Sequence, residues 1–252
     1  MPINPPARAT KLPRHGVARV ISRLGQGSRT QAAQWVSEGR VRVNGRVVHD
    51  PQFPVRQSLD RIDIDGKALT QAPPLALMLN KPRGLVTTVK DEQDRKTVYS
   101  CFSGANLPWL APVGRLDKAS EGLLLFSNEP AWAATIIDPQ CGQSKTYHVQ
   151  IDRLPDPDLL AVLEHGVRVG DERLAVMSAR CLRSGGTNAW LEIILDEGRN
   201  RQIRRLLAAL DVSVLRLVRV AIGTLCLGEL PKGQWRMLTA HEIESLTVAA
   251  SK

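Results

Sequence analysis

Apolar residues near the start of the chain recur with a helical period. The segment VARVISRL has apolar residues at i, i+3, i+4 and i+7, namely Val17, Val20, Ile21 and Leu24. This spacing predicts a helix with one apolar face. Gly25 and Gly27 end that helix. Ser28, followed three residues later by Gln31, has the capping-box spacing that begins a second helix.

The next apolar residues alternate instead of following a helical period. The run VRVNGRVV predicts two short strands around Asn44-Gly45, because this dipeptide is the strongest short hairpin signal. Its valines alternate with Arg40, Arg42 and Arg46, so the arginines are expected to share one face. The run RIDIDG predicts a further strand.

After Pro73-Pro74 the pattern indicates a second, larger body. Strands are predicted on both sides of a turn at 81–84, and again at 122–126, 146–151, 174–182 and 189–195. Helices are predicted at about 129–137, 156–165 and 200–210. Strands outnumber helices without a βαβ alternation, which favours an α+β fold with a mixed, mainly antiparallel sheet. The expected segments are a disordered basic tail (1–16), a small basic domain (17–68), a linker (69–76), a larger domain (77–246) and a short tail (247–252).

Charge is concentrated in the smaller body. The formal net charge of the 252 residues is +9, and the first 70 residues hold 12 lysines and arginines against 5 acids. This asymmetry favours a module that docks on nucleic acid, although a solvated basic face with no partner is the alternative.

Several classes of protein are not expected. The opening residues have no apolar core of a secretory signal, and no apolar run reaches 18 residues, so a cytoplasmic protein without membrane segments is predicted. The cysteines Cys101, Cys141, Cys181 and Cys226 are expected to be reduced thiols. Neither a metal-binding spacing nor a phosphate-binding glycine motif is present, so no metal or nucleotide cofactor is expected.

The most informative string is PVGRLDKASEGLLLFSN, residues 112–128. Arg115 and Asp117 lie two residues apart just before an apolar strand, and can point the same way if the chain is extended there. A carboxylate beside a guanidinium stays ionised and can serve as nucleophile or base. A structural Asp that caps a turn or pairs with the arginine is the alternative.

Two further segments carry candidate side chains. In a helix over 200–210, Ile203, Leu206, Leu207 and Leu210 would be buried. Arg201 and Arg205 then lie on the opposite face, toward RNA phosphate or solvent, and Arg204 at the edge is the only one of the three arginines able to turn toward a carboxylate. Tyr147 shares a strand face with Lys145 and Val149, and is either a core aromatic or a ring available for stacking.

Taken together, these strings resemble a known family. GRLDKASEGLLLFSN resembles the catalytic motif of the RsuA/RluB/RluE/RluF family of ribosomal RNA pseudouridine synthases. NKPRG (80–84), KTYHV (145–149), LDEGRNRQIRRLL (195–207) and the segment 219–239 resemble further family segments in the same order. Residues from about 16 to 67 resemble the S-four RNA-binding domain, first named in a ribosomal small-subunit protein. Asn128-Glu129-Pro130 departs from the Asn-Asp-Gly that is common in the family.

The resemblance implies roles for individual residues. Asp117 matches the catalytic aspartate, Tyr147 the tyrosine that stacks on the target base, and Arg204 the basic residue that pairs with the aspartate. Arg115 matches the arginine that takes the place of the flipped-out nucleotide. Further RNA contacts are implied for Asn80, Lys81, Lys145, Arg199, Asn200, Arg201, Gln202 and Arg205, and in the S-four-type domain for Arg19, Arg23, Ser28, Arg29, Arg40 and Arg42.

The implied activity is the isomerisation of one uridine to pseudouridine in ribosomal RNA or an assembling subunit, with the large subunit favoured. The base would be flipped into a closed pocket, which GLLLF and Ile203 are expected to line. Neither a cofactor nor a metal is implied, and a monomer is expected. Two alternatives remain: a non-catalytic RNA-binding or ribosome-assembly factor on the same scaffold, and a glycosidic hydrolase that uses Asp117 with Glu121.

Overall fold

The computed structural model describes residues 13–89, 91–138 and 143–247. The chain divides into two compact units, one formed by residues 1–73 with Pro108–Leu110 and the other by the rest. Most of the expected N-terminal tail, the last five residues and Cys141 lie outside the described residues. The described cysteines, Cys101, Cys181 and Cys226, are free thiols.

The first unit combines two helices with short strands. Helices α1 (Val17–Arg23) and α2 (Arg29–Ser37) have the predicted bounds to within a residue or two. The Ser28 hydroxyl accepts a hydrogen bond from the backbone N–H of Gln31 at 3.0 Å, so the predicted cap is confirmed. The strands are β1 (His15–Gly16), β2 (Val41–Val43), β3 (Arg46–Val47), β4 (Pro54–Val55), β5 (Ile62–Ile64) and β6 (Lys67–Ala68). β1 pairs with β4, and the other four form a sheet in the order β3-β2-β5-β6.

The register of the β2–β3 hairpin corrects the expected arrangement of arginines. Arg42 lies opposite Val47 and Arg46 lies opposite Val43, so Arg42 and Arg46 are on different faces because cross-strand partners share a face. The two-residue turn at Asn44-Gly45, both with positive φ, shifts the alternation by one between the strands. The expected tail is also shorter than predicted, because His15 and Gly16 pair with β4.

The core of the first unit is aliphatic. Val17, Val20 and Ile21 of α1 pack with Ala32 and Val36 of α2 against the buried valines and Ile62 of the strands. The four apolar positions of the predicted helix period, Val17, Val20, Ile21 and Leu24, are all buried. Arg19, Arg29, Arg42 and Arg46 are among the exposed residues of the same elements.

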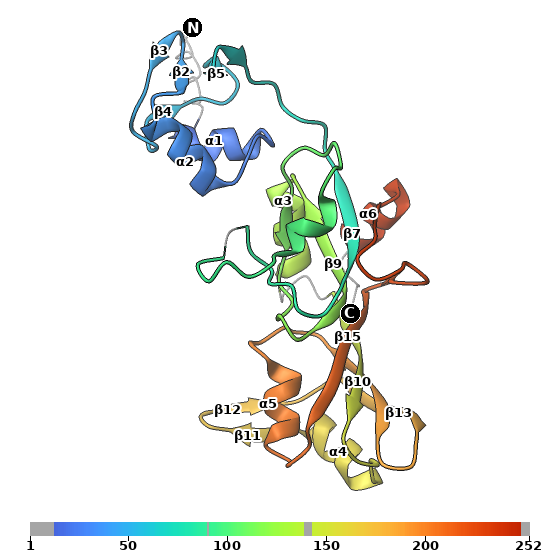
Figure 1. Cartoon of the computed structure of the whole chain (residues 1–252). Helices are drawn as coiled ribbons and strands as arrows, with labels where there is room; N and C mark the ends of the chain where they lie inside the picture. The colour runs from blue at the N-terminus through green and yellow to red at the C-terminus, as the bar shows by residue number, and fades with distance from the viewer. Residues whose placement is uncertain (1–12, 90, 139–142, 248–252) are drawn as a thin grey trace, which may run out of the picture. The chain divides into compact units, whose positions relative to one another are not determined.

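The second unit is built around one mixed sheet (Figure 1). Its main order is β13-β14-β10-β15-β9-β7-β17, with β16 on β15 and β8 on β9. Among the described strands of this sheet, the β15–β9 pair is parallel and the other pairs are antiparallel. The predicted mixed, mainly antiparallel α+β fold is therefore confirmed. The strands are β7 (Ala76–Lys81), β8 (Ala111–Val113), β9 (Glu121–Ser127), β10 (Lys145–Ile151), β11 (Val167–Val169), β12 (Glu172–Leu174), β13 (Ser178–Ser184), β14 (Ala189–Leu195), β15 (Val214–Ile222), β16 (Leu225–Cys226) and β17 (Trp235–Met237).

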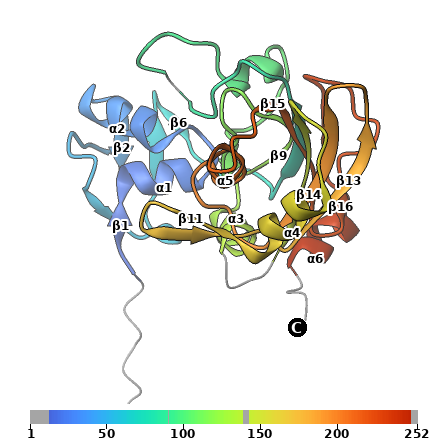
Figure 2. The same ribbon diagram turned by 90° about the horizontal axis from the view of Figure 1, so that it is seen from below.

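Helices pack against two separate parts of this sheet. Seen from below, the strands from β9 to β13 follow a curve (Figure 2). Helix α5 contacts β15 and the small β11–β12 hairpin, whereas α3 and α6 contact each other near β8, β9 and β16. The helices are η1 (Val98–Phe102), α3 (Pro130–Ile137), α4 (Pro157–His165), α5 (Gln202–Ala208) and α6 (Ala240–Thr247). No helix in the described part of the chain has the length and hydropathy needed to cross a bilayer.

Two predicted strands differ from the structure. Residues after the 81–84 turn do not form a strand, and among the described residues Val86 makes only an isolated bridge with Thr97. The run 174–182 is divided between the end of β12 and the start of β13. Both runs are apolar but only partly buried, since Val89, Met177 and Leu182 are exposed, and an apolar run alone does not fix where a strand begins and ends.

Candidate active site

A cavity of about 510 Å³ opens in the second unit. Its walls come from the loop before β9, from β10 and β15, and from the segment that leads into α5. Apolar side chains form its depth, namely Val113, Ile136, Leu195, Ile203, Leu217 and Ile222. Polar side chains at its edge and wall include Arg115, Asp117, Lys145, Tyr147, Arg201, Arg204 and Arg219. An apolar cleft with a few convergent polar groups is the usual form of a small-ligand or base-binding site.

Asp117 lies in the loop between β8 and β9 and faces this cavity. Its side chain is 39% exposed, and its Oδ2 lies 3.3 Å from Nη1 of Arg201. Arg115 is exposed and lines the same cavity. The carboxylate is therefore accessible to a ligand and has a cation beside it.

The pairing of Asp117 corrects the expected role of the α5 arginines. Arg201, predicted on the far side of the helix, contacts the carboxylate, whereas Arg204 was predicted to do so. Arg201 is not on the helix: it is the residue before it and has φ of 50°, a left-handed conformation that redirects its side chain. The helical periodicity from which its direction was predicted therefore does not apply to it.

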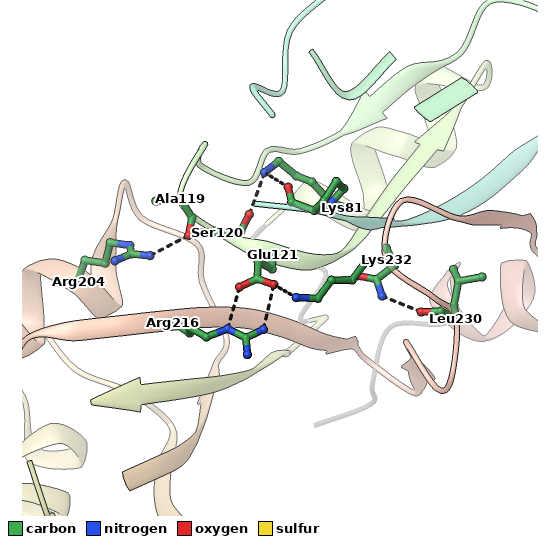
Figure 3. Close-up of polar contacts among 10 residues, drawn as sticks. Lys81, Ala119, Ser120, Glu121, Arg204, Arg216, Leu230 and Lys232 are labelled. Atoms are coloured by element: carbon green, nitrogen blue, oxygen red, sulfur yellow. Dashed lines mark hydrogen bonds and ion pairs between the residues drawn. The ribbon is translucent and has the colours of Figure 1, made fainter. Parts of the chain in front are cut away.

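Arg204 does turn inward, but it holds the backbone of the Asp117 loop. Its Nη2 donates to the carbonyl of Ala119 at 3.2 Å (Figure 3), and its Nη1 donates to that of Val214 at 3.4 Å. Its Nε is buried and has no hydrogen-bond partner among the described residues. Burial lowers the pKa of Arg204, while nearby Asp117 raises it. Arg204 thus interacts electrostatically with Asp117, and its Nε–H is available to donate a further hydrogen bond.

Lys81 anchors the same loop from the other side. Its side chain is fully buried, and its Nζ donates to the carbonyl of Ser120 at 2.8 Å (Figure 3). It also donates to the carbonyls of Asp117 at 3.1 Å and Pro82 at 3.2 Å. Asn80 is buried as well and donates to the carbonyl of Leu230. The expectation that Asn80 and Lys81 contact RNA is wrong, because both side chains are buried and bond backbone carbonyls inside the protein.

Replacing Lys81 by methionine is expected to destabilise the protein in a pH-dependent way. Burial lowers the pKa of Lys81 to about 8 from its ordinary 10.5. Between those values the unfolded chain binds more protons than the folded one, so this group favours folding more as pH rises. The advantage of the wild type over Lys81→Met in chemical denaturation is therefore predicted to grow above pH 8, by at most about 1.4 kcal/mol per pH unit. A difference that stays constant from pH 7 to pH 10 would contradict this.

Glu121 is unavailable for acid–base work. It is 2% exposed, and its carboxylate accepts hydrogen bonds from the Arg216 guanidinium at 3.0 Å and from Lys232 Nζ (Figure 3). Both cations lower the pKa of Glu121 against the opposing effect of burial. A hydrolase that pairs Asp117 with Glu121 needs a second carboxyl group at the scissile bond, so the structure removes that alternative.

Tyr147 forms part of the cavity wall. β10 alternates as predicted: Tyr147 and Val149 are buried, and Tyr147 and Lys145 line the cavity. Lys145 is half-buried, its Nζ lies 3.4 Å from the Asp196 carbonyl, and burial together with Arg219 lowers its pKa. An aromatic ring in an otherwise aliphatic wall gives a base a surface on which to stack.

The remaining residues of segment 199–205 that were expected to contact RNA lie partly in the cavity lining and partly outside it. Arg199, Asn200 and Gln202 line the cavity, with Arg199 paired to Glu197 at 2.7 Å. Gln202 is buried, because its amide bonds the Ala175 carbonyl and the Arg199 backbone N–H. Arg205 is held by Glu172 and is not part of the cavity lining. Gln202 therefore braces the segment and is not free to contact RNA.

In the first unit, four of the six expected RNA contacts have available side chains. Arg19, Arg29 and Arg42 are exposed and Arg23 is half-buried. Ser28 is buried by its capping role. Arg40 is bound by Asp65 at 2.6 Å and lies over the Trp35 ring, and the bond to Asp65 raises its pKa. Arg40, whose side chain is 40% exposed, thus already has an acidic and an aromatic partner within the first unit.

Several cavity residues were missed from the sequence. Leu217, Arg219 and Ile222 belong to β15, a strand that was not predicted. Its alternating run VLRLVRVAI is the signal that would have identified it. Conversely, the predicted lining by GLLLF is wrong, because Leu123 to Phe126 are core residues of β9, whereas the predicted lining by Ile203 is confirmed.

Comparison with known proteins identifies this architecture. The family model for RNA pseudouridylate synthase matches residues 76–209, more than half of the chain, and the S4 domain model matches residues 17–60. The chain belongs to the RNA pseudouridylate synthase family. It is therefore an RNA pseudouridine synthase with an S4 RNA-binding domain, as the sequence motifs predicted.

Individual relatives of this synthase align over nearly its whole length. Ribosomal large subunit pseudouridine synthase B of Bacillus subtilis is 34% identical over 92% of this chain and 95% of its own. An uncharacterized RNA pseudouridine synthase of Aquifex aeolicus is 34% identical over 91% of this chain and 92% of its own. A solved pseudouridylate synthase structure superposes with a TM-score of 0.62 at 30% identity, covering 92% of this chain and 99% of that one.

Proposed function

We propose that this synthase isomerises a single uridine in ribosomal RNA, with the large subunit as its target. The observation that supports this most is the single cavity that an accessible Asp117 and the buried Tyr147 both line. The name of the Bacillus subtilis relative supports the choice of the large subunit. The relatives are named as synthases, so the comparisons do not favour a non-catalytic assembly factor.

The proposed roles follow from where the side chains lie. The target uridine leaves its stack and enters the cavity, where Tyr147 stacks on the base and Arg115, exposed at the edge, fills the gap left in the RNA. Asp117 acts at the junction of ribose and base, either by attacking C1′ or by removing the 2′ proton. Arg204 orients the Asp117 loop through Ala119 and presents its free Nε. Arg201 holds the carboxylate until RNA phosphate competes for the guanidinium.

The experiment that tests this function measures the hydrogen displaced from C5 of uridine. Unmodified small- and large-subunit RNA, labelled with tritium at C5, would each be incubated with the protein. The proposal predicts release of one equivalent of label from large-subunit RNA alone. Release from small-subunit RNA would show that the small subunit, and not the large one, is the substrate. No release from either RNA or from precursor particles would contradict the proposal. A cytoplasmic, monomeric enzyme that needs no cofactor is part of the same proposal.

Charge removal in the S4 domain is expected to weaken RNA binding and its salt dependence. The triple variant Arg19→Gln, Arg29→Gln, Arg42→Gln removes three exposed guanidinium groups. For each phosphate that the variant no longer neutralises, the slope of log K against log salt should fall by about 0.7 to 0.9. The control is Arg40→Gln, whose guanidinium is already held by Asp65. A triple variant with the wild-type slope in filter binding would show that the domain does not dock through this surface.

A further inference from the structure

Arg219 is a buried cation in the cavity wall that has no carboxylate partner in the described part of the chain. It is only 6% exposed, and its Nε donates to the Leu123 carbonyl at 2.8 Å. Its Nη2 is buried and has no hydrogen-bond partner among the residues that the structure describes. A buried donor left unsatisfied destabilises the folded protein, and a charged donor does so more than a neutral one. Such a group in a cavity wall indicates an acceptor that arrives with the ligand.

The surroundings of Arg219 point to a ligand with negative charge. On adjacent strands Arg219 lies opposite Tyr147, and it lowers the pKa of its neighbour Lys145. The two carboxylates that line the cavity are engaged elsewhere, Asp117 with Arg201 and Glu197 with Arg199. Among the described residues, the hydrogen bonds of Arg219 and Lys145 go to carbonyl oxygens, and Asp196 partly offsets the charge of Lys145 but not that of Arg219.

We propose that Arg219, with Lys145 beside it, takes up the negative charge of the uracil ring when the C1′–N1 bond breaks. This inference rests on the proposed function. When that bond breaks, its electron pair goes to N1, and the charge spreads over the O2 and O4 carbonyls of the ring. After the ring turns, C5 bonds to C1′ and loses its proton while N1 gains one, so that the product is an isomer. A guanidinium offers donors only and keeps its charge, which suits a ring oxygen whose charge rises during the reaction.

The test compares two RNAs that differ in how well the departing ring holds its charge. One carries uridine at the target and the other 5-fluorouridine, whose fluorine stabilises the detached anion. Cleavage of C1′–N1 is followed under single-turnover conditions by nuclease digestion and chromatography. Arg219→Gln is expected to lower the rate of C1′–N1 cleavage about 10²-fold to 10³-fold in the uridine RNA. In the 5-fluorouridine RNA the same variant should lower that rate markedly less. RNA affinity should stay unchanged, and Arg219→Lys should recover part of the rate.

A merely structural role predicts a different pattern. If Arg219 only holds β15 to β9 through Leu123, the variant will slow both RNAs by the same factor, and the inference is overturned. If Arg219→Gln fails to fold, Lys145→Gln serves as the second variant, since Lys145 is half-exposed. Its cleavage rate should fall roughly 10-fold on the uridine RNA, and less on the 5-fluorouridine RNA. Arg180→Gln, an exposed guanidinium on β13, is the charge control and should leave both rates unchanged. Absence of cleavage by the wild type would instead reject the proposed function itself.

Discussion

Asp117→Asn is expected to abolish pseudouridine formation while leaving RNA binding nearly intact. Asparagine keeps the volume of the side chain but can neither attack C1′ nor accept the 2′ proton. Loss of a residue that reacts covalently or as the base typically costs about 10⁴-fold or more in turnover. Single-turnover release of the C5 hydrogen from labelled RNA measures the rate, and filter binding measures the affinity.

The separation of rate from binding is what makes this variant informative. The Asp117–Arg201 pair is half-exposed, and exposed pairs contribute at most about 1 kcal/mol. Its loss should therefore change neither the melting temperature nor the RNA affinity by much. Residual turnover within 10-fold of the wild type would remove Asp117 from the mechanism, whereas a parallel loss of RNA binding would mean that the site had been disrupted.

Gly122→Ala is expected to be the most destabilising single substitution near the site. Gly122 has φ of +100°, and a Cβ there would overlap the backbone of Arg219, its carbonyl oxygen first. The overlap lies at the parallel pairing of β9 with β15, where Arg219 is opposite Gly122. Backbone strain and a clash with backbone atoms together predict a loss of at least about 4 kcal/mol in the free energy of unfolding.

Gly84 supplies a matched control for Gly122. Its φ is +97°, almost the same, but a Cβ on it would meet no atom within 4 Å. Gly84→Ala therefore isolates the conformational cost, about 1–3 kcal/mol. Urea denaturation of the two variants measures the difference. Equal losses would mean that β15 moves away readily from β9, and that the wall of the cavity is less rigid than the structure indicates.

Local patterns predicted the local elements of this fold well. Strand β14 has the predicted bounds, and α3 and α4 begin within a residue of theirs, because alternation, an N-cap and proline at the first turn act over a few residues. The order of the sheet was not predictable in the same way. β15 lies between β10 and β9, which precede it by many residues, and nothing within its own sequence specifies those partners.

In the candidate site, too, local patterns predicted some features, whereas features set by distant parts of the chain were missed. Tyr147 lines the cavity with Lys145, as the alternation of β10 predicted. Arg201 pairs with Asp117 because its left-handed conformation just before α5 redirects its side chain, whereas Arg204 turns inward to backbone carbonyls of the Asp117 loop and β15. Lys81 looked like a residue for RNA phosphate, and only the sheet shows that its ammonium holds three carbonyls. Arg219 was not predicted as a site residue because its strand, β15, was not predicted.

The most direct test of the account maps pseudouridine along ribosomal RNA. Unmodified RNA of both subunits would be treated with the wild type or with Asp117→Asn, derivatised with carbodiimide, and read by primer extension. The account predicts a single new stop in large-subunit RNA with the wild type and none with the variant. A stop that persists with Asp117→Asn, or none on naked RNA and precursor particles while the RNA is still bound, would contradict it.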